Sequence, residues 1–232
     1  NGHGTHVAGI IGAIANNGIG ISGVNWDISI MALKAADNSK SGYLSLSEVI
    51  EALYYAANNG ADIVNMSFQI GDELTGEDFF MEQAIEYAYS KGVTMVAAAG
   101  NDGQAWLAYP ARHDKVIAVN AVGPDLLRPD WSNYGKGIDV AAPGDDIIST
   151  WPTNTFASAS GTSMAAPQVT GVAALLISQG VSGSENIRNI LHSTAMDLGA
   201  PNYDNIYGWG LVNAHAAVNN GLITNMHIFA GD

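Results

Sequence analysis

Three residue types that together carry out acyl transfer occur in the chain, each in a distinctive sequence context. Ser163 lies in the heptapeptide GTSMAAP, at the start of an apolar run of small residues that predicts a buried helix. His3 lies in NGHGTHVAG, and Asn101 lies in AAAGNDG. A serine hydroxyl becomes a good nucleophile only when a base takes its proton and a donor stabilises the oxyanion. The sequence therefore offers a nucleophile, a base and an oxyanion donor.

The three motifs, in this order and at these separations, resemble those of the subtilisin-like serine peptidases (subtilases), from the first residue to about Ala217. The resemblance implies a serine endopeptidase that hydrolyses peptide bonds in proteins through an acyl-enzyme on Ser163. It assigns the general base to His3 and not to His6, and places Asn101 in the oxyanion hole. A metal site on the two histidines is the weaker reading, because neither has a glutamate beside it and no third ligand is near.

The resemblance also implies a third triad member, an aspartate in an Asp-Thr-Gly or Asp-Ser-Gly segment well before the histidine. Only two residues precede His3, and no later aspartate lies in such a context. We therefore expect residues 1–232 to be a single peptidase domain that is truncated at its N-terminus, with low activity of its own. The alternative is a catalytically silent subtilase-fold domain that binds peptides or has a structural role.

The resemblance predicts part of the substrate-binding groove. One side is an edge strand that pairs with the peptide backbone, where Gln69 replaces the usual glycine, and the other is a wall of small residues. Asp102, beside Asn101, favours a basic substrate residue at the rim, and residues 41–43 are expected on the opposite side. The predicted substrate-binding residues are Ser67, Phe68, Gln69, Ala98, Ala99 and Gly100.

A calcium ion is the cofactor that the resemblance implies, and no organic cofactor is expected. Calcium takes oxygen ligands, which a loop of carbonyl groups and an asparagine side chain supplies. The expected ligands are the side chain of Asn17 and the carbonyl groups of Ala15, Ile19 and Ile21. A plain Asn-Gly turn is the alternative. A second, weaker cation site is considered near Ala111, His113, Val116 and Asp139.

Strands and helices alternate along the chain, which predicts an α/β fold with a mainly parallel sheet and helices on both faces. The resemblance implies the subtilisin-like three-layer α/β/α arrangement. The active groups should gather at the carboxyl ends of the strands. Strands are expected at 28–33, 62–67, 93–98, 116–122 and 138–141. Helices are expected at 45–59, 77–91, 163–179 and 213–219, and a further helix should begin near Ser184, which suits an N-terminal cap.

Composition excludes several classes of protein. The formal charge of −14, from 8 basic and 22 acidic residues, leaves no basic face for nucleic acid. The longest apolar run, from Val172 to Ile177, is too short to span a membrane. The absence of cysteine excludes disulfides and a thiol nucleophile. The family resemblance adds three expectations: secretion, a monomeric state and an inhibitory pro-region encoded upstream, with proteins or peptides as substrates.

Overall fold

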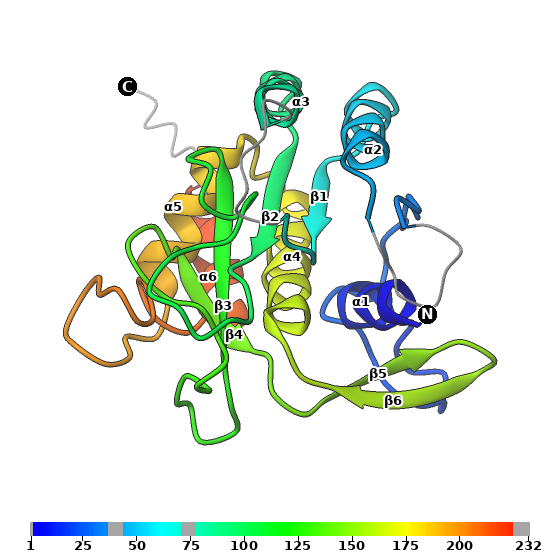
Figure 1. Cartoon of the computed structure of the whole chain (residues 1–232). Coiled ribbons are helices and arrows are strands. Elements are labelled where there is room, and N and C mark those ends of the chain that lie inside the picture. Colours follow the sequence, from blue (N-terminus) through cyan, green and yellow to red (C-terminus); the bar gives the residue numbers. More distant parts are fainter. Residues whose placement is uncertain (1, 37–43, 71–77, 225–232) are drawn as a thin grey trace, which may run out of the picture.

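A four-stranded parallel sheet lies at the centre of the molecule (Figure 1). The computed structural model of the chain describes residues 2–36, 44–70 and 78–224. The strand order is β1-β2-β3-β4, and every neighbouring pair is parallel. The strands are β1 (Ile63–Met66), β2 (Thr94–Ala98), β3 (Val116–Val122) and β4 (Val140–Pro143).

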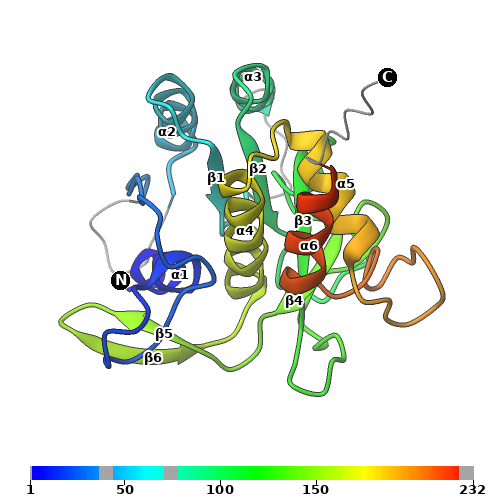
Figure 2. The same cartoon turned by 180° about the vertical axis from the view of Figure 1, so that it is seen from behind.

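Helices cover both faces of this sheet, as the sequence predicts. On β2, Val96 and Ala98 point into one apolar core, whereas Met95 and Ala97 point into the other. This alternation follows from the two-residue period of a strand. Figure 2 shows α4, α5 and α6 in front of the strands, while α2 and α3 pack in the second core. The helices are α2 (Leu46–Asn58), α3 (Asp78–Ser90), α4 (Thr162–Ser178), α5 (Ser184–Thr194) and α6 (Ala214–Thr224).

The start of α5 differs from the prediction. The sequence favours Ser184 as the N-cap, but Ser184 is the first residue of the helix and Gly183 occupies the cap position, without a side-chain capping bond. Gly183 has φ +86°, a conformation that glycine adopts at little cost. The bend into the helix is therefore made by the glycine and not by the serine.

The strand predicted at residues 28–33 is wrong. This segment belongs to neither sheet, and its apolar side chains are exposed, with Ile30 at 46%, Met31 at 40% and Leu33 at 39%. A strand requires hydrogen bonds to a neighbour, and among the described residues no strand pairs with this one. Within the four-stranded sheet, β1 is an edge strand whose partner is β2.

An antiparallel hairpin that the sequence analysis did not identify supports the N-terminal helix, α1 (His3–Gly12). The hairpin consists of β5 (Ile147–Trp151) and β6 (Thr155–Ala159) and lies beside α1 in both views (Figures 1 and 2). Ser149 Oγ donates to the carbonyl group of His6 at 2.7 Å, and Thr150 Oγ1 donates to that of Thr5 at 2.8 Å. These bonds fix the direction of the helix that carries His3.

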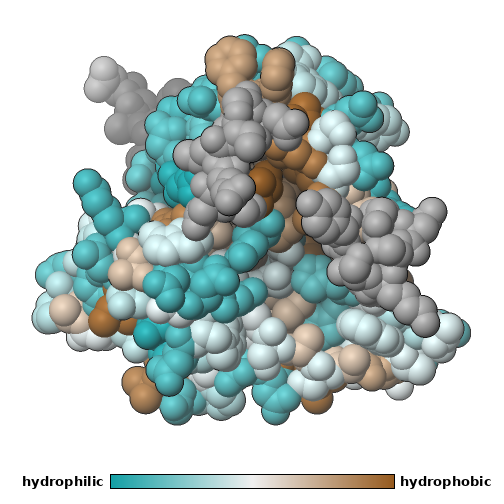
Figure 3. Space-filling model, in the orientation of Figure 1, coloured by the Kyte–Doolittle hydropathy of each residue, from teal (hydrophilic) through white to brown (hydrophobic). Residues whose placement is uncertain are grey.

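The surface is largely polar. The face seen in Figure 3 is mostly hydrophilic or neutral in colour, in keeping with the excess of acidic residues. No helix in the described parts of the chain combines the length and the apolar character that crossing a membrane would require.

Candidate active site

His3, Asn101 and Ser163 come from three separate elements and line one pocket of about 230 Å³. His3 is the first residue of α1, Asn101 follows β2 by three residues, and Ser163 lies in the first turn of α4. The structure thus brings together all three predicted catalytic residues. Residues that the sequence analysis did not assign to the site complete the lining: His6, Trp151, Ala159, Ser160, Gly161 and Met164.

Ser163 is held against the end of β1 by two reciprocal hydrogen bonds. The hydroxyl of Ser163 donates to the carbonyl group of Ser67 at 3.1 Å, and the hydroxyl of Ser67 donates to the carbonyl group of Ser163 at 2.9 Å. Ser67 is only 9% exposed. Ser67, which the sequence analysis predicts as a substrate-binding residue, therefore lies directly beside Ser163.

Thr162 orients the side chain of Asn101. The Oδ1 atom of Asn101 accepts hydrogen bonds from the backbone N–H of Thr162 at 2.8 Å and from its hydroxyl at 2.9 Å. Because Oδ1 accepts these bonds, Nδ2 is the donor that this amide can offer to a further group. A Cβ atom placed on Gly161 would lie 3.6 Å from Nδ2 and 3.7 Å from Oδ1 of Asn101, and 3.7 Å from the backbone nitrogen of Ser163. The Nδ2 group and the Ser163 N–H therefore border the same small volume, as an oxyanion hole requires.

The turn before Asn101 depends on Gly100 and Asn133. Gly100 has φ +112°, and a Cβ atom on it would overlap the Nδ2 group of Asn133. That amide donates to the carbonyl group of Ala99 at 3.3 Å, and its oxygen accepts from the backbone N–H groups of Asp102 at 2.9 Å and Gln104 at 3.0 Å. Asn133 thus fixes the loop on both sides of Asn101. It is 32 positions away in the sequence, where no motif indicates it.

His3 has a pKa below its ordinary value. The first cause is burial of the imidazole group by the surrounding protein, although the residue as a whole is exposed at the surface, and the second is repulsion from the neighbouring His6. The low pKa favours the neutral ring, which is the form that can accept a proton. Gly2 permits Trp151 to pack here, because a Cβ atom on Gly2 would overlap the indole ring.

His6 has a different environment from His3. It is fully buried, and its Nε2 lies 3.0 Å from the carbonyl oxygens of both Ile147 and Ala157. Two acceptors at this distance require a hydrogen on Nε2. The ring therefore joins α1 to both strands of the hairpin, which agrees with the assignment of the base to His3 and not to His6.

The remaining predicted groove residues lie in two neighbouring segments. Ala98, Ala99 and Gly100 are buried at the end of β2, and Phe68 is half-buried against the core beneath α2 and α3. Gln69 is exposed and its Nε2 donates to the Oδ2 atom of Asp102 at 3.3 Å, which links the two segments. The predicted contribution of residues 41–43 lies outside the described residues.

The predicted calcium loop is an exposed turn. The Oδ1 atom of Asn17 accepts a hydrogen bond from the backbone N–H of Ile19 at 2.9 Å, and Gly18 and Gly20 have φ of +71° and +59°. The carbonyl groups and the Asn17 amide of this short segment are neutral oxygens, which is the donor type that calcium takes. The oxygens of Ala15, Asn17, Ile19 and Ile21 amount to half or more of the six to eight that calcium requires. In the type and number of its donors the loop therefore fits part of a calcium site.

Asp139, one of the residues near the second cation site that the sequence suggests, already has two basic neighbours. The Oδ1 atom of Asp139 lies 2.7 Å from Nε2 of His192 and 3.3 Å from Nε of Arg188, and Oδ2 accepts from the backbone N–H of Ala118 at 2.7 Å. A carboxylate that already faces a guanidinium group is a poor ligand for a further cation. Asp139 instead ties α5 to the sheet.

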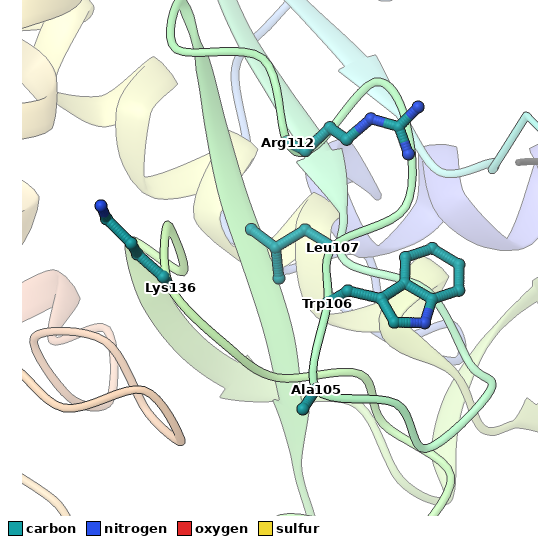
Figure 4. A pocket seen from close by; sticks show the side chains of 5 residues that line it. All are labelled: Ala105, Trp106, Leu107, Arg112 and Lys136. Atoms are coloured by element: carbon teal, nitrogen blue, oxygen red, sulfur yellow. The ribbon is translucent and has the colours of Figure 1, made fainter. Parts of the chain in front are cut away.

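A larger concavity of about 440 Å³ lies elsewhere (Figure 4). It contains none of the predicted site residues, and its side chains offer no hydroxyl, thiol or histidine. The pocket with the three reactive groups is therefore the candidate active site. The larger concavity is lined by Ala105, Trp106, Leu107, Arg112 and Lys136.

Comparison with known proteins agrees with this geometry. Subtilisin Savinase from Lederbergia lenta is 45% identical over 94% of this chain and 77% of its own length. The alkaline protease of Alkalihalobacillus alcalophilus is also 45% identical over 94% of the chain, which spans only 55% of that protein. Thermitase from Thermoactinomyces vulgaris is 45% identical, over 94% of the chain and 75% of its own length.

A solved structure and a family profile also relate the chain to peptidases. The crystal structure of a lanthipeptide protease superposes with a TM-score of 0.82 and 26% identity, over 95% of this chain and 75% of that one. The profile described as the subtilase family, Peptidase_S8, matches residues 1–210. On these findings the chain belongs to the subtilase family of peptidases.

Proposed function

We propose that the chain is the catalytic part of a serine endopeptidase that cleaves peptide bonds in proteins through an acyl-enzyme on Ser163. The observation that carries the proposal is the convergence of His3, Ser163 and the Asn101 amide on one pocket. The family supports peptidase activity in general, and the roles of individual residues rest on this convergence.

The proposed reaction begins when the hydroxyl of Ser163 leaves the carbonyl group of Ser67 and turns to the imidazole ring of His3. The oxygen of Ser163 bonds to the carbonyl carbon of the substrate, and its proton passes to His3. The oxyanion is stabilised by the Asn101 amide and the Ser163 backbone N–H, at the positive end of the α4 dipole. The carbon–nitrogen bond then breaks and His3 returns the proton to the leaving amine. Water releases the acyl group by the same steps.

The silent-domain alternative predicts a bound peptide but no acyl-enzyme. The reason to consider this alternative is that residues 1–232 contain no aspartate in the Asp-Thr-Gly or Asp-Ser-Gly context of the family. In subtilisin, a member of the same family, loss of that aspartate lowers turnover by about 3 × 10⁴. A reactive fluorophosphonate, which reports one covalent event, is therefore a more sensitive probe of this chain than turnover of a peptide.

The first prediction concerns the nucleophile. We expect a fluorophosphonate to label the chain covalently, with loss of fluoride, and Ser163→Ala to abolish the label, because the new bond forms on Ser163 Oγ. Intact-mass spectrometry measures the mass gain. Ser178→Ala is the matched control, since Ser178 lies at the other end of α4 and its hydroxyl donates to the carbonyl group of Leu175 within the same helix. Equal labelling of Ser163→Ala and the parent would refute the assignment.

The second prediction concerns the threonine that orients the oxyanion donor. Thr162→Val removes the hydroxyl that donates to Asn101 and accepts from the Gly100 N–H. Loss of a net hydrogen bond of about 1–1.5 kcal/mol corresponds to labelling that is roughly 5- to 13-fold slower. Thr162→Ser keeps the hydroxyl and should restore most of the rate. A Thr162→Val protein that reacts as fast as the parent would show that Asn101 is positioned without this hydroxyl.

The third prediction concerns pH. Only neutral His3 accepts a proton, so the labelling rate should fall as the pH drops through the His3 pKa. Burial and His6 lower that pKa, so the midpoint of the fall should lie below the ordinary histidine value of about 6.5. Labelling reactions quenched at a series of times, at pH values from about 4 to 9, give the rate at each pH and hence the midpoint. Circular dichroism at the same pH values confirms that the protein stays folded. A midpoint at or above 6.5 would contradict the proposed environment of His3.

We also propose that the loop around Asn17 holds a structural calcium ion, which when bound would tie the loop in place by electrostatic attraction. A ligand that binds only the folded state raises its stability. Added calcium should therefore raise the unfolding temperature, and Asn17→Ala should remove most of that rise. Asn186→Ala, which loses an exposed amide on α5, is the control. An equal calcium-dependent rise in both variants would exclude Asn17 as a ligand.

Secretion, a monomeric state and an inhibitory pro-region complete the proposal as expectations from the family resemblance. Their common support is the membership of the chain in the subtilase family.

A further inference from the structure

The larger concavity, of about 440 Å³, shares no lining residue with the pocket of His3 and Ser163. Arg112 and Lys136 are two of its five lining residues, and none of the five is acidic. The chain as a whole has 22 acidic and only 8 basic residues. Positive charge is therefore concentrated at this concavity, against the overall balance of the molecule. None of its residues has a part in the proposed reaction, so a ligand there is independent of the proposed function.

Lys136 reaches the concavity because it lies between two glycines. A Cβ atom on Gly135 would lie 2.9 Å from the carbonyl oxygen of Ala105, and one on Gly137 would lie 3.3 Å from Cδ1 of Leu107. Both glycines have positive φ, +134° and +102°, which side chains at these positions would oppose. The loop that carries Lys136 therefore lies directly against the other wall.

Backbone and side-chain hydrogen bonds fix the two walls relative to each other. The backbone N–H of Tyr134 donates to the carbonyl group of Gln104 at 3.0 Å, and the backbone N–H of Gln104 donates to Oδ1 of Asn133 at 3.0 Å. These bonds lie next in sequence to the residues that line the concavity. The concavity is thus preformed, and a ligand does not have to order its walls.

The two cationic groups differ in their surroundings. Lys136 is exposed, and within residues 2–36, 44–70 and 78–224 it forms no ion pair with an acidic side chain. The Cζ atom of Arg112 lies 5.3 Å from the centre of the Tyr109 ring, which helps to hold the guanidinium group in place. A guanidinium group has five N–H donors and can serve more than one acceptor. Both side chains can therefore attract an anion to the concavity.

An apolar surface lies between these charges. Figure 4 shows Leu107 between Lys136 and Trp106, with Arg112 along the upper edge in this view. Leu107 is 4% exposed and forms a fixed floor, whereas Trp106 is 36% exposed and offers part of its indole ring. A flat apolar group can cover such a floor and pack against an indole ring. The concavity therefore combines an apolar surface with positive charge at its edges.

We propose that this concavity binds an organic anion in which a carboxylate is joined to a flat apolar body. The body covers Leu107 and packs against the indole ring of Trp106, while the carboxylate pairs with Lys136 and Arg112 adds a second positive charge. The volume of about 440 Å³ lies within the range of about 300–1,000 Å³ that is typical of small-molecule sites. An inorganic anion would leave the apolar floor uncovered, and a neutral aromatic ligand would leave Lys136 unmatched.

The test compares naphthalene-2-carboxylate with naphthalene-2-carboxamide, which have the same flat body and differ in charge. Isothermal titration calorimetry at low ionic strength measures the Kd of each. The proteins are the parent, Lys136→Met, Trp106→Leu and Trp106→Phe. Lys91→Met is the charge-matched control, because exposed Lys91 follows α3 and lies over the Tyr87 ring, outside the concavity.

We expect the parent to bind the carboxylate with a Kd on the order of 1 mM, as a small ligand in an open site does. The carboxamide should bind about 2- to 5-fold more weakly, the range for an exposed ion pair. Lys136→Met should remove most of that difference, and Lys91→Met should behave as the parent. Trp106→Leu should weaken both ligands by a similar factor, because it removes a flat surface and no charge, and Trp106→Phe should restore part of the binding.

Equal affinity of the parent for the two ligands would overturn the inference, as would a carboxylate preference that persists undiminished in Lys136→Met. Unchanged affinities in Trp106→Leu would overturn the place of the apolar body. Circular dichroism of each variant confirms that it is folded. Protein already labelled at Ser163 by a fluorophosphonate should give the same Kd values, since the concavity contains no residue of that pocket.

Discussion

The arrangement of the site depends on how the first turn of α4 is fastened to the ends of two strands. Ser163 exchanges hydrogen bonds with Ser67 after β1, and Thr162 exchanges them with Asn101 and Gly100 after β2. Thr162 is fully buried, so these bonds lie in a medium of low dielectric where they are strong and where leaving one unmade is costly. The proposed nucleophile, Ser163, and the proposed oxyanion donor, Asn101, are therefore held in place by the same contacts that attach the helix to the sheet.

The packing of α4 makes this attachment possible. The helix contacts all four strands of the sheet, and small residues such as Ala165, Ala166 and Ala173 are completely buried on it. On its far side Gly171 approaches Val24 so closely that a Cβ atom would be about 2.5 Å from that side chain. A helix with larger residues would stand further from the sheet and move Ser163 away from Ser67 and Asn101. The small-residue composition of the GTSMAAP segment is thus a requirement of the site as well as of the core.

The sequence predicted those parts of the fold that have a strong local pattern. The four central strands and the helices that cover them follow from apolar runs and glycine stops, and three motifs identified His3, Asn101 and Ser163. The segment 28–33 has the composition of a buried strand, but composition cannot supply a hydrogen-bonded neighbour. The roles of Asn133, Trp151 and Thr162 were not predicted, because each depends on a partner more than thirty residues away. The β5–β6 hairpin had a usable signal, since Pro152 and Asn154 separate two runs that suit strands.

Different parts of the chain build the pocket around His3 and the predicted rim of the substrate groove, and this separation has a consequence for how each can vary. Trp151 and His6 line the pocket and belong to the hairpin and to α1, which pack together and set the surroundings of His3. Gln69 and Asp102 are exposed residues beyond strand ends. A change in the hairpin therefore alters the surroundings of His3, whereas Gln69 and Asp102 can change without disturbing buried contacts. The predicted rim is consequently less constrained by the fold than the pocket is.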